Sequence, residues 1–199
     1  MSNRYCINKL YRSRKEYCHY DDSSKEDQWQ LEVYLHALGL MKKHNFRSII
    51  DIGCGSGYKL MTYFEEYQTI GLELSVNVEI LKEKYPERKW KVCNFNEVPD
   101  LSTDVVICSD VIEHIVDPDE LISFIKGIKF EYLVISTPDR SLMHKPWKVK
   151  YYGPPKNKSH IREWTFNEFN RYISSHFKVI DHRVTNLGQF TQMAICTPL

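Results

Sequence analysis

The segment 49–57, with the sequence IIDIGCGSG, joins apolar residues and one carboxylate to three glycines. Gly53, Gly55 and Gly57 are spaced two residues apart, and Asp51 precedes them. Because glycine has no Cβ atom, it lets the backbone turn sharply and approach a ligand closely. Such a loop at the end of a buried strand can bind a nucleotide-type cofactor. The alternative is a tight strand-to-helix turn that binds no ligand.

Glu73 ends the next apolar segment and lies 22 residues after Asp51. An acidic side chain about 20 residues beyond a glycine-rich loop is placed to accept hydrogen bonds from the ribose hydroxyls of a nucleoside. The alternative for Glu73 is a solvated residue at a strand end. Together with the loop, it favours a cofactor that contains a nucleoside.

Alternating strands and helices must position these residues. The hydrophobic pattern predicts strands at 48–52, 69–74, 90–94, 105–108, 132–136, 178–183 and 192–196. It predicts helices at 24–44, with Ser24 as N-cap, and at 58–67, 76–84, 118–128 and 166–176. This alternation indicates βαβ units and therefore an α/β protein with a mostly parallel sheet. The last two strands are joined by a short link around residues 186–188, which predicts an antiparallel hairpin.

The composition is that of one globular domain, with 199 residues, 42% hydrophobic and 27% charged. No apolar run reaches the roughly 18 residues that could cross a membrane, and the basic N-terminus has no signal-peptide pattern. The six cysteines form no C-x-x-C pair. We therefore expect a reducing, cytoplasmic environment, no membrane insertion and no metal site.

The spacing of the glycines distinguishes two kinds of cofactor site. The dinucleotide fingerprint G-x-G-x-x-G requires glycine where this chain has Tyr58, and the third glycine comes one residue early. This departure weighs against NAD and FAD. The string D-I-G-C-G-S-G instead resembles the first motif of the class I S-adenosylmethionine-dependent methyltransferases.

The resemblance implies a Rossmann-like fold, with a mostly parallel seven-stranded sheet, a C-terminal antiparallel hairpin and helices on both faces. It implies S-adenosyl-L-methionine as cofactor, with Asn94 and Phe95 on the adenine and Ser109 and Asp110 beside the methionine. The family usually has Asp where this chain has Asn94, which implies either a weaker contact with the adenine or a polar contact from Asn96 instead. The implied cofactor-binding residues are Asp51, Gly53, Cys54, Gly55, Gly57, Glu73, Leu74, Asn94, Phe95, Ser109 and Asp110.

The segment 104–121, DVVICSDVIEHIVDPDEL, is similar to small-molecule methyltransferases of the ubiquinone-biosynthesis and sugar-modifying type. In those proteins E-H recurs just beyond the fourth strand. The similarity implies that His114 lies near the sulfonium methyl group, where an imidazole with a pKa near 6.5 could take the proton of a hydroxyl. The alternative is a histidine that caps the turn before Asp117 and Pro118.

A second string, H-x-R-E-[WFY]-T at 160–165, resembles small O-methyltransferases encoded with polysaccharide-synthesis genes. It makes His160 a second possible base, and it implies that Arg162 and Trp164 hold the methyl acceptor. Thr165 and Glu168 predict a capping box at the start of the following helix.

The segment 140–162 has seven basic residues and no acidic one. We expect a basic substrate loop at about 140–165 that attracts an anionic acceptor, with Tyr151 and Tyr152 among its contacts. A solvated basic loop is the alternative. The basic residues are Arg140, Lys145, Lys148, Lys150, Lys156, Lys158 and Arg162.

The first 22 residues carry four tyrosines, and we expect them to form a lid over a single methyltransferase domain at 23–199. A flexible tail is the alternative. We predict O-methylation of a small, anionic sugar, nucleotide sugar or surface-glycan precursor. A nucleic-acid methyltransferase and a non-catalytic cofactor-binding subunit are the rival hypotheses, although an isoelectric point near 7.6 weighs against nucleic acid. The oligomeric state is left open.

Overall fold

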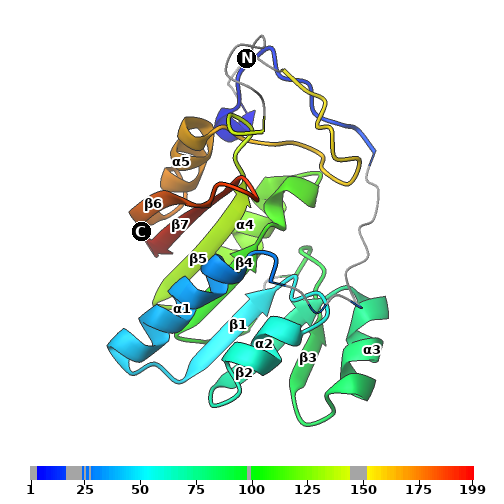
Figure 1. Ribbon diagram of the computed structural model, residues 1–199, viewed down its shortest axis with the longest axis vertical. Helices are drawn as coiled ribbons and strands as arrows, with labels where there is room; N and C mark the ends of the chain where they lie inside the picture. Colours follow the sequence, from blue (N-terminus) through cyan, green and yellow to red (C-terminus); the bar gives the residue numbers. More distant parts are fainter. Residues whose placement is uncertain (1–3, 17–23, 25, 27, 98–99, 144–151) are drawn as a thin grey trace.

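The computed structural model of the chain describes residues 4–16, 24, 26, 28–97, 100–143 and 152–199. One seven-stranded sheet has the order β3-β2-β1-β4-β5-β7-β6 (Figure 1). The strands are β1 (Ser48–Ile52), β2 (Gln68–Glu73), β3 (Lys89–Val92), β4 (Val105–Ser109), β5 (Tyr132–Pro138), β6 (Lys178–Asn186) and β7 (Thr191–Thr197). The α-helices are α1 (Leu31–His44), α2 (Tyr58–Tyr63), α3 (Ser75–Lys84), α4 (Pro118–Gly127) and α5 (Phe166–Ser174). Within the described residues, the 3-10 helices are η1 (Arg4–Cys6) and η2 (Ile112–His114).

The strands from β3 to β5 pair in parallel, whereas β7 is antiparallel to both β5 and β6. The predicted mostly parallel sheet with a C-terminal antiparallel hairpin is therefore confirmed. Because the carboxyl ends of parallel strands meet at one edge of a sheet, the residues that follow β1, β2, β3 and β4 lie along the same edge.

Alternate residues of the central strands pack on opposite faces of the sheet. Ile49 belongs to a buried core with Val33 of α1, Leu60 of α2 and Val78 of α3. The next residue of β1, Ile50, belongs to the other core, which includes residues of α4 and α5. Helices therefore cover both faces, as predicted.

Two predicted helix boundaries differ from the structure by more than two residues. Helix α1 begins at Leu31 rather than at Ser24, because Gln30 has a left-handed conformation (φ 62°, ψ 14°) that does not occur inside a right-handed helix. Helix α2 ends at Tyr63 rather than at residue 67, because Phe64 leaves the helical region (φ −125°, ψ 26°). The capping box of α5 was predicted correctly. Among the described residues, no helix has both the length and the hydropathy needed to span a bilayer.

Candidate active site

The glycine loop between β1 and α2 uses a backbone conformation that favours glycine. Gly53, Gly55 and Gly57 have φ angles of 72°, 54° and 70°. A Cβ atom added to Gly53 would lie 2.5 Å from Cγ2 of Val111, in the segment that follows β4. The side chain of Cys54 is buried in the core that includes α1, α2 and α3. The loop therefore depends on glycine both for its dihedral angles and for its close approach to a neighbouring segment.

Two carboxylates lie beside this loop. Oδ2 of the buried Asp51 accepts a hydrogen bond of 2.9 Å from the hydroxyl group of Tyr34 in α1. Oε1 of Glu73, the last residue of β2, accepts a hydrogen bond of 3.3 Å from the backbone N–H of Gly55. Oε2 of Glu73 accepts one from the backbone N–H of Leu74, whose side chain is exposed. Both carboxylates are thus held at the carboxyl edge of the sheet.

The residues after β3 and β4 extend the same edge. Asn94 is exposed, whereas Phe95 is half-buried against a phenylalanine of α4 at a ring distance of 5.5 Å. Ser109 is buried, and its hydroxyl lies 3.1 Å from that of Ser136. Asp110 has a φ of 51°, and its Oδ1 accepts a hydrogen bond of 2.6 Å from the Ser136 hydroxyl. Burial raises the pKa of Asp110 above its ordinary value.

The two predicted catalytic histidines lie together although they come from distant segments. The ring centroids of His114 and His160 are 4.9 Å apart, and the rings are nearly perpendicular, at 86°. The backbone N–H groups of Ile161 and Arg162 donate to the carbonyl oxygen of Glu113 at 2.8 and 3.3 Å. These two bonds tie the segment that carries His160 to η2, which carries His114.

Hydrogen bonds fix which nitrogen of each ring carries the proton. Nδ1 of His114 lies 2.9 Å from the carbonyl oxygen of Ser159, which can only accept, so Nδ1 donates and Nε2 carries the lone pair. In His160, Nδ1 lies 2.8 Å from Oε1 of Glu163, and Nε2 lies 2.9 Å from Nδ2 of Asn157. The Asn157 amide is oriented by its Oδ1, which accepts from Ser159. Both nitrogens of His160 are therefore engaged in hydrogen bonds.

Glu113 completes this cluster, and it was not among the site residues predicted from the sequence. Its side chain is 1% exposed, and Oε2 accepts a hydrogen bond of 3.0 Å from the hydroxyl group of Thr137. Oε1 lies 3.9 Å from Nε2 of His114. Burial, together with the nearby charge of Asp110, raises the pKa of Glu113 well above its ordinary value. The available signal was an acidic residue placed directly before a histidine within an apolar segment.

Two residues predicted to hold the acceptor have other positions. Trp164 is fully buried, and its Nε1 donates a hydrogen bond of 2.9 Å to the carbonyl oxygen of Tyr5. It is a core residue, so the prediction that it contacts the acceptor is wrong. The guanidinium group of buried Arg162 donates to the carbonyl oxygens of Ile115 and Val116 at 2.7 and 2.6 Å. Arg162 therefore holds the turn after η2 instead of presenting its charge at the surface.

The basic segment is likewise divided between the surface and the interior. Arg140 is buried and forms an ion pair of 2.6 Å with Glu168 of α5, whereas Lys156 and Lys158 are exposed. Tyr152 is half-buried. Tyr151, Lys145, Lys148 and Lys150 lie outside the described residues.

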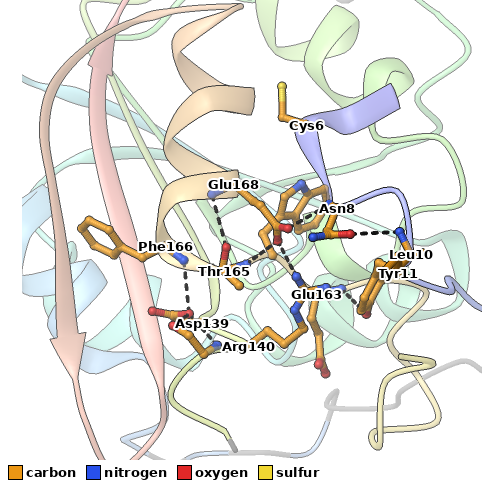
Figure 2. Close-up of polar contacts among 12 residues, drawn as sticks. Cys6, Asn8, Leu10, Tyr11, Asp139, Arg140, Glu163, Thr165, Phe166 and Glu168 are labelled. Carbon is orange, nitrogen blue, oxygen red and sulfur yellow. Dashed lines mark hydrogen bonds and ion pairs between the residues drawn. The ribbon is translucent and has the colours of Figure 1, made fainter. Parts of the chain in front are cut away.

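The N-terminal residues 4–16 lie beside the segment that precedes α5 (Figure 1). The backbone N–H of Asn8 donates to Oε1 of Glu168 at 2.8 Å, and the Tyr11 hydroxyl accepts from the N–H of Glu163 at 3.0 Å. Figure 2 shows both contacts, with the side chain of Arg140 between them. The Arg140 guanidinium lies 4.1 Å from the centre of the Tyr11 ring. The segment is thus joined to the residues around the histidine cluster.

The sheet order, the glycine loop and the carboxylate that ends β2 together define a class I methyltransferase. A family model described as a methyltransferase domain matches residues 16–183, and the chain belongs to this family. The methyl donor of the class, S-adenosylmethionine, is the cofactor of this chain.

Solved structures of similar fold are numerous, whereas no curated protein matches the chain. PH0226 protein from Pyrococcus horikoshii OT3 has a TM-score of 0.66 and 16% identity, over 90% of this chain and 95% of that chain. The methyltransferase domain of bacterial CtHen1-CN has a TM-score of 0.64 and 20% identity, over 84% and 98%. Magnesium protoporphyrin IX methyltransferase from Synechocystis PCC 6803, with bound SAH, has a TM-score of 0.63 and 14% identity, over 88% and 90%. At these identities the similarity shows the fold and leaves the acceptor open.

Proposed function

We propose that the chain transfers the methyl group of S-adenosylmethionine to a hydroxyl oxygen of a small, anionic sugar, nucleotide sugar or surface-glycan precursor. The observation that carries this proposal is the tautomer of His114. Its Nδ1 proton is committed to the carbonyl oxygen of Ser159, so Nε2 bears the lone pair that can take a hydroxyl proton. His160, whose ring lies 4.9 Å from that of His114, is the second possible base.

The residues at the carboxyl edge fit the cofactor by their chemistry. Glu73 offers carboxylate oxygens to the ribose hydroxyls, and the glycine loop allows the backbone to approach the ligand. The exposed amide of Asn94 and the ring of Phe95 suit the adenine, while Ser109 and Asp110 suit the polar methionine end. We assign the cofactor to these residues together with Asp51, Cys54 and Leu74.

The acceptor pocket is assigned to residues 1–22, acting as a lid, and to the loop at about 140–165. The contacts of Asn8 and Tyr11 with Glu168 and Glu163 support this assignment, because they join the two segments beside His160. Exposed Lys156 supplies positive charge for an anionic acceptor. Closure of the two segments would exclude water and hold the hydroxyl in line with the sulfonium methyl group.

A nucleic-acid methyltransferase is the second candidate. Lys156, Lys158 and Tyr152 combine basic and aromatic side chains in one loop, which is a combination that binds phosphates and stacks bases. The net charge of +1 makes nucleic-acid methylation the weaker of the two hypotheses, because a strongly basic domain is typical of proteins that bind nucleic acid.

Incubation with methyl-labelled S-adenosylmethionine tests the two candidates side by side. One arm contains a pool of nucleotide sugars and the other contains single-stranded RNA. We expect label on an oxygen of a nucleotide sugar, transfer slowed by about 10² to 10⁴-fold in His114→Ala, and normal transfer in the control His182→Gln. Labelled RNA with an unlabelled sugar pool would replace this proposal by the second one. Tight cofactor binding with no turnover in either arm would favour a non-catalytic subunit.

A further inference from the structure

We infer that Glu113, His114 and His160 form a binding site for one divalent transition-metal cation. One carboxylate oxygen of Glu113 and one ring nitrogen of each histidine lie within 4.8 Å of one another. Ligand atoms about 2.0–2.2 Å from one ion are roughly 3–4 Å apart, so a small contraction would bring all three onto a cation. Two imidazoles and one carboxylate form a ligand set that suits Mn²⁺, Fe²⁺ or Zn²⁺. The cysteine pattern gave no indication of this site, because none of its ligands is cysteine.

A buried oxygen in this cluster points to the same conclusion. Among the described residues, Oε1 of Glu113 has no hydrogen-bond partner, although the side chain is only 1% exposed. A buried carboxylate oxygen without a partner is unfavourable, because it has lost its hydration. Oε1 faces Nε2 of His114 at 3.9 Å. A cation between these two atoms would compensate the carboxylate charge.

The second observation is the hydrogen bonding behind the two rings. Nδ1 of His114 is bound to the carbonyl oxygen of Ser159, and Nδ1 of His160 is bound to the carboxylate of Glu163, which is itself buried. Metal-binding histidines have this arrangement, in which one nitrogen donates to a carbonyl or carboxylate and the other is left to the metal. In both rings the lone pair is therefore on Nε2.

One existing contact must be exchanged when the cation binds. Nε2 of His160 accepts a hydrogen bond of 2.9 Å from Nδ2 of Asn157. Asn157 is exposed, so this amide group can donate to water instead. The exchange costs one hydrogen bond and gains one metal ligand.

A catalytic role of the cation rests on the proposed function, whereas the existence of the metal-binding site does not. A cation with open coordination positions could hold the acceptor oxygen and lower the pKa of its hydroxyl. Nε2 of His114 would take the hydroxyl proton in the metal-free chain only. With the cation bound, this nitrogen would be a metal ligand, and the hydroxyl proton would leave to water. As the new C–O bond forms, the bond from the methyl carbon to sulfur breaks, and S-adenosylhomocysteine leaves with the electron pair.

Titration of chelator-treated protein with MnCl₂, followed by calorimetry and by electron paramagnetic resonance, tests the site directly. We expect one Mn²⁺ per chain and at least about 100-fold weaker binding in Glu113→Gln and in His160→Gln. Glu163→Gln, which changes the hydrogen bond behind His160, should weaken binding by about 10- to 100-fold. The control His182→Gln should bind Mn²⁺ like the unaltered chain. Each variant is compared only after it has been shown to bind S-adenosylhomocysteine, which establishes that it is folded.

Absence of Mn²⁺ binding by the unaltered chain would overturn the metal site, and so would equal binding by the unaltered chain, Glu113→Gln and His160→Gln. Methyl transfer that continues undiminished in the presence of a chelator would remove the catalytic role of the cation while leaving the proposed function intact. Tight Mn²⁺ binding without methyl transfer to a hydroxyl would leave the metal site intact and overturn the proposed function. The two proposals therefore fail separately.

Discussion

The hydroxyl group of Tyr34 lies 2.9 Å from Oδ2 of Asp51, and both side chains are buried. This hydrogen bond connects α1 to the carboxylate that precedes the glycine loop. We expect Tyr34→Phe to weaken S-adenosylhomocysteine binding by about 2- to 10-fold, because a typical hydrogen bond contributes about 0.5–1.5 kcal/mol. Calorimetry measures the change. Tyr63→Phe, which removes an exposed hydroxyl that donates to Gln28, serves as the control. Equal affinities of Tyr34→Phe and Tyr63→Phe for S-adenosylhomocysteine would show that Tyr34 does not support the site.

Two glycines should respond in opposite directions to alanine. Gly53→Ala places a Cβ atom 2.5 Å from Val111 at a φ of 72°, so we expect the free energy of unfolding to fall by more than about 1 kcal/mol. Gly39, inside α1, has no atom within 4 Å of an added Cβ, and Gly39→Ala should stabilise the chain by about 0.5–1 kcal/mol. Urea unfolding gives both values. A Gly53→Ala variant as stable as Gly39→Ala would show that the loop does not need glycine there.

Stability should fall on the acid side of neutrality because of three partly buried histidines. Desolvation lowers the pKa of His36, His176 and His182 below the ordinary value of 6.5. At these three side chains the unfolded chain therefore binds more protons than the folded chain, so their contribution to the free energy of unfolding decreases as the pH drops below about 6.5. Melting temperatures measured across this range should fall less steeply toward acid pH in His182→Gln than in the unaltered chain. A slope that stays the same in His182→Gln would show that His182 does not contribute.

The N-terminal segment should respond to the cofactor if it is a lid. The backbone N–H groups of Arg12 and Arg14 donate to the carbonyl oxygens of Tyr152 and Ile161. We expect amide hydrogen exchange in residues 5–20 to slow when S-adenosylhomocysteine binds, because closure would protect these bonds. Equal exchange with and without the ligand would mean that the segment does not close over the site.

The fold could be predicted because its signals are local. The apolar strand 48–52 and the glycines that follow it are continuous in sequence, and the alternation of strands and helices sets the sheet type. The start of α1 could not be predicted from periodicity, because it depends on the left-handed backbone of Gln30.

The histidine cluster could be predicted only in part. His160, Arg162 and Trp164 lie in one short string. The segment that carries His160 is nevertheless hydrogen-bonded to η2, whereas Trp164 is buried in the core. The difference depends on partners far away in sequence, namely the carbonyl oxygens of Glu113 and Tyr5. No local pattern reveals such contacts.

Binding of S-adenosylhomocysteine at the glycine loop and Glu73 is measured most directly by thermal denaturation with and without ligand. At 100 times its dissociation constant, the ligand should stabilise the folded chain by about 2.7 kcal/mol and raise the melting temperature, whereas NAD should have no effect. Glu73→Ala should lose most of this shift, and Glu66→Ala, an exposed carboxylate before β2, should keep it. A shift with NAD but none with S-adenosylhomocysteine, or a full shift in Glu73→Ala, would contradict the assigned site.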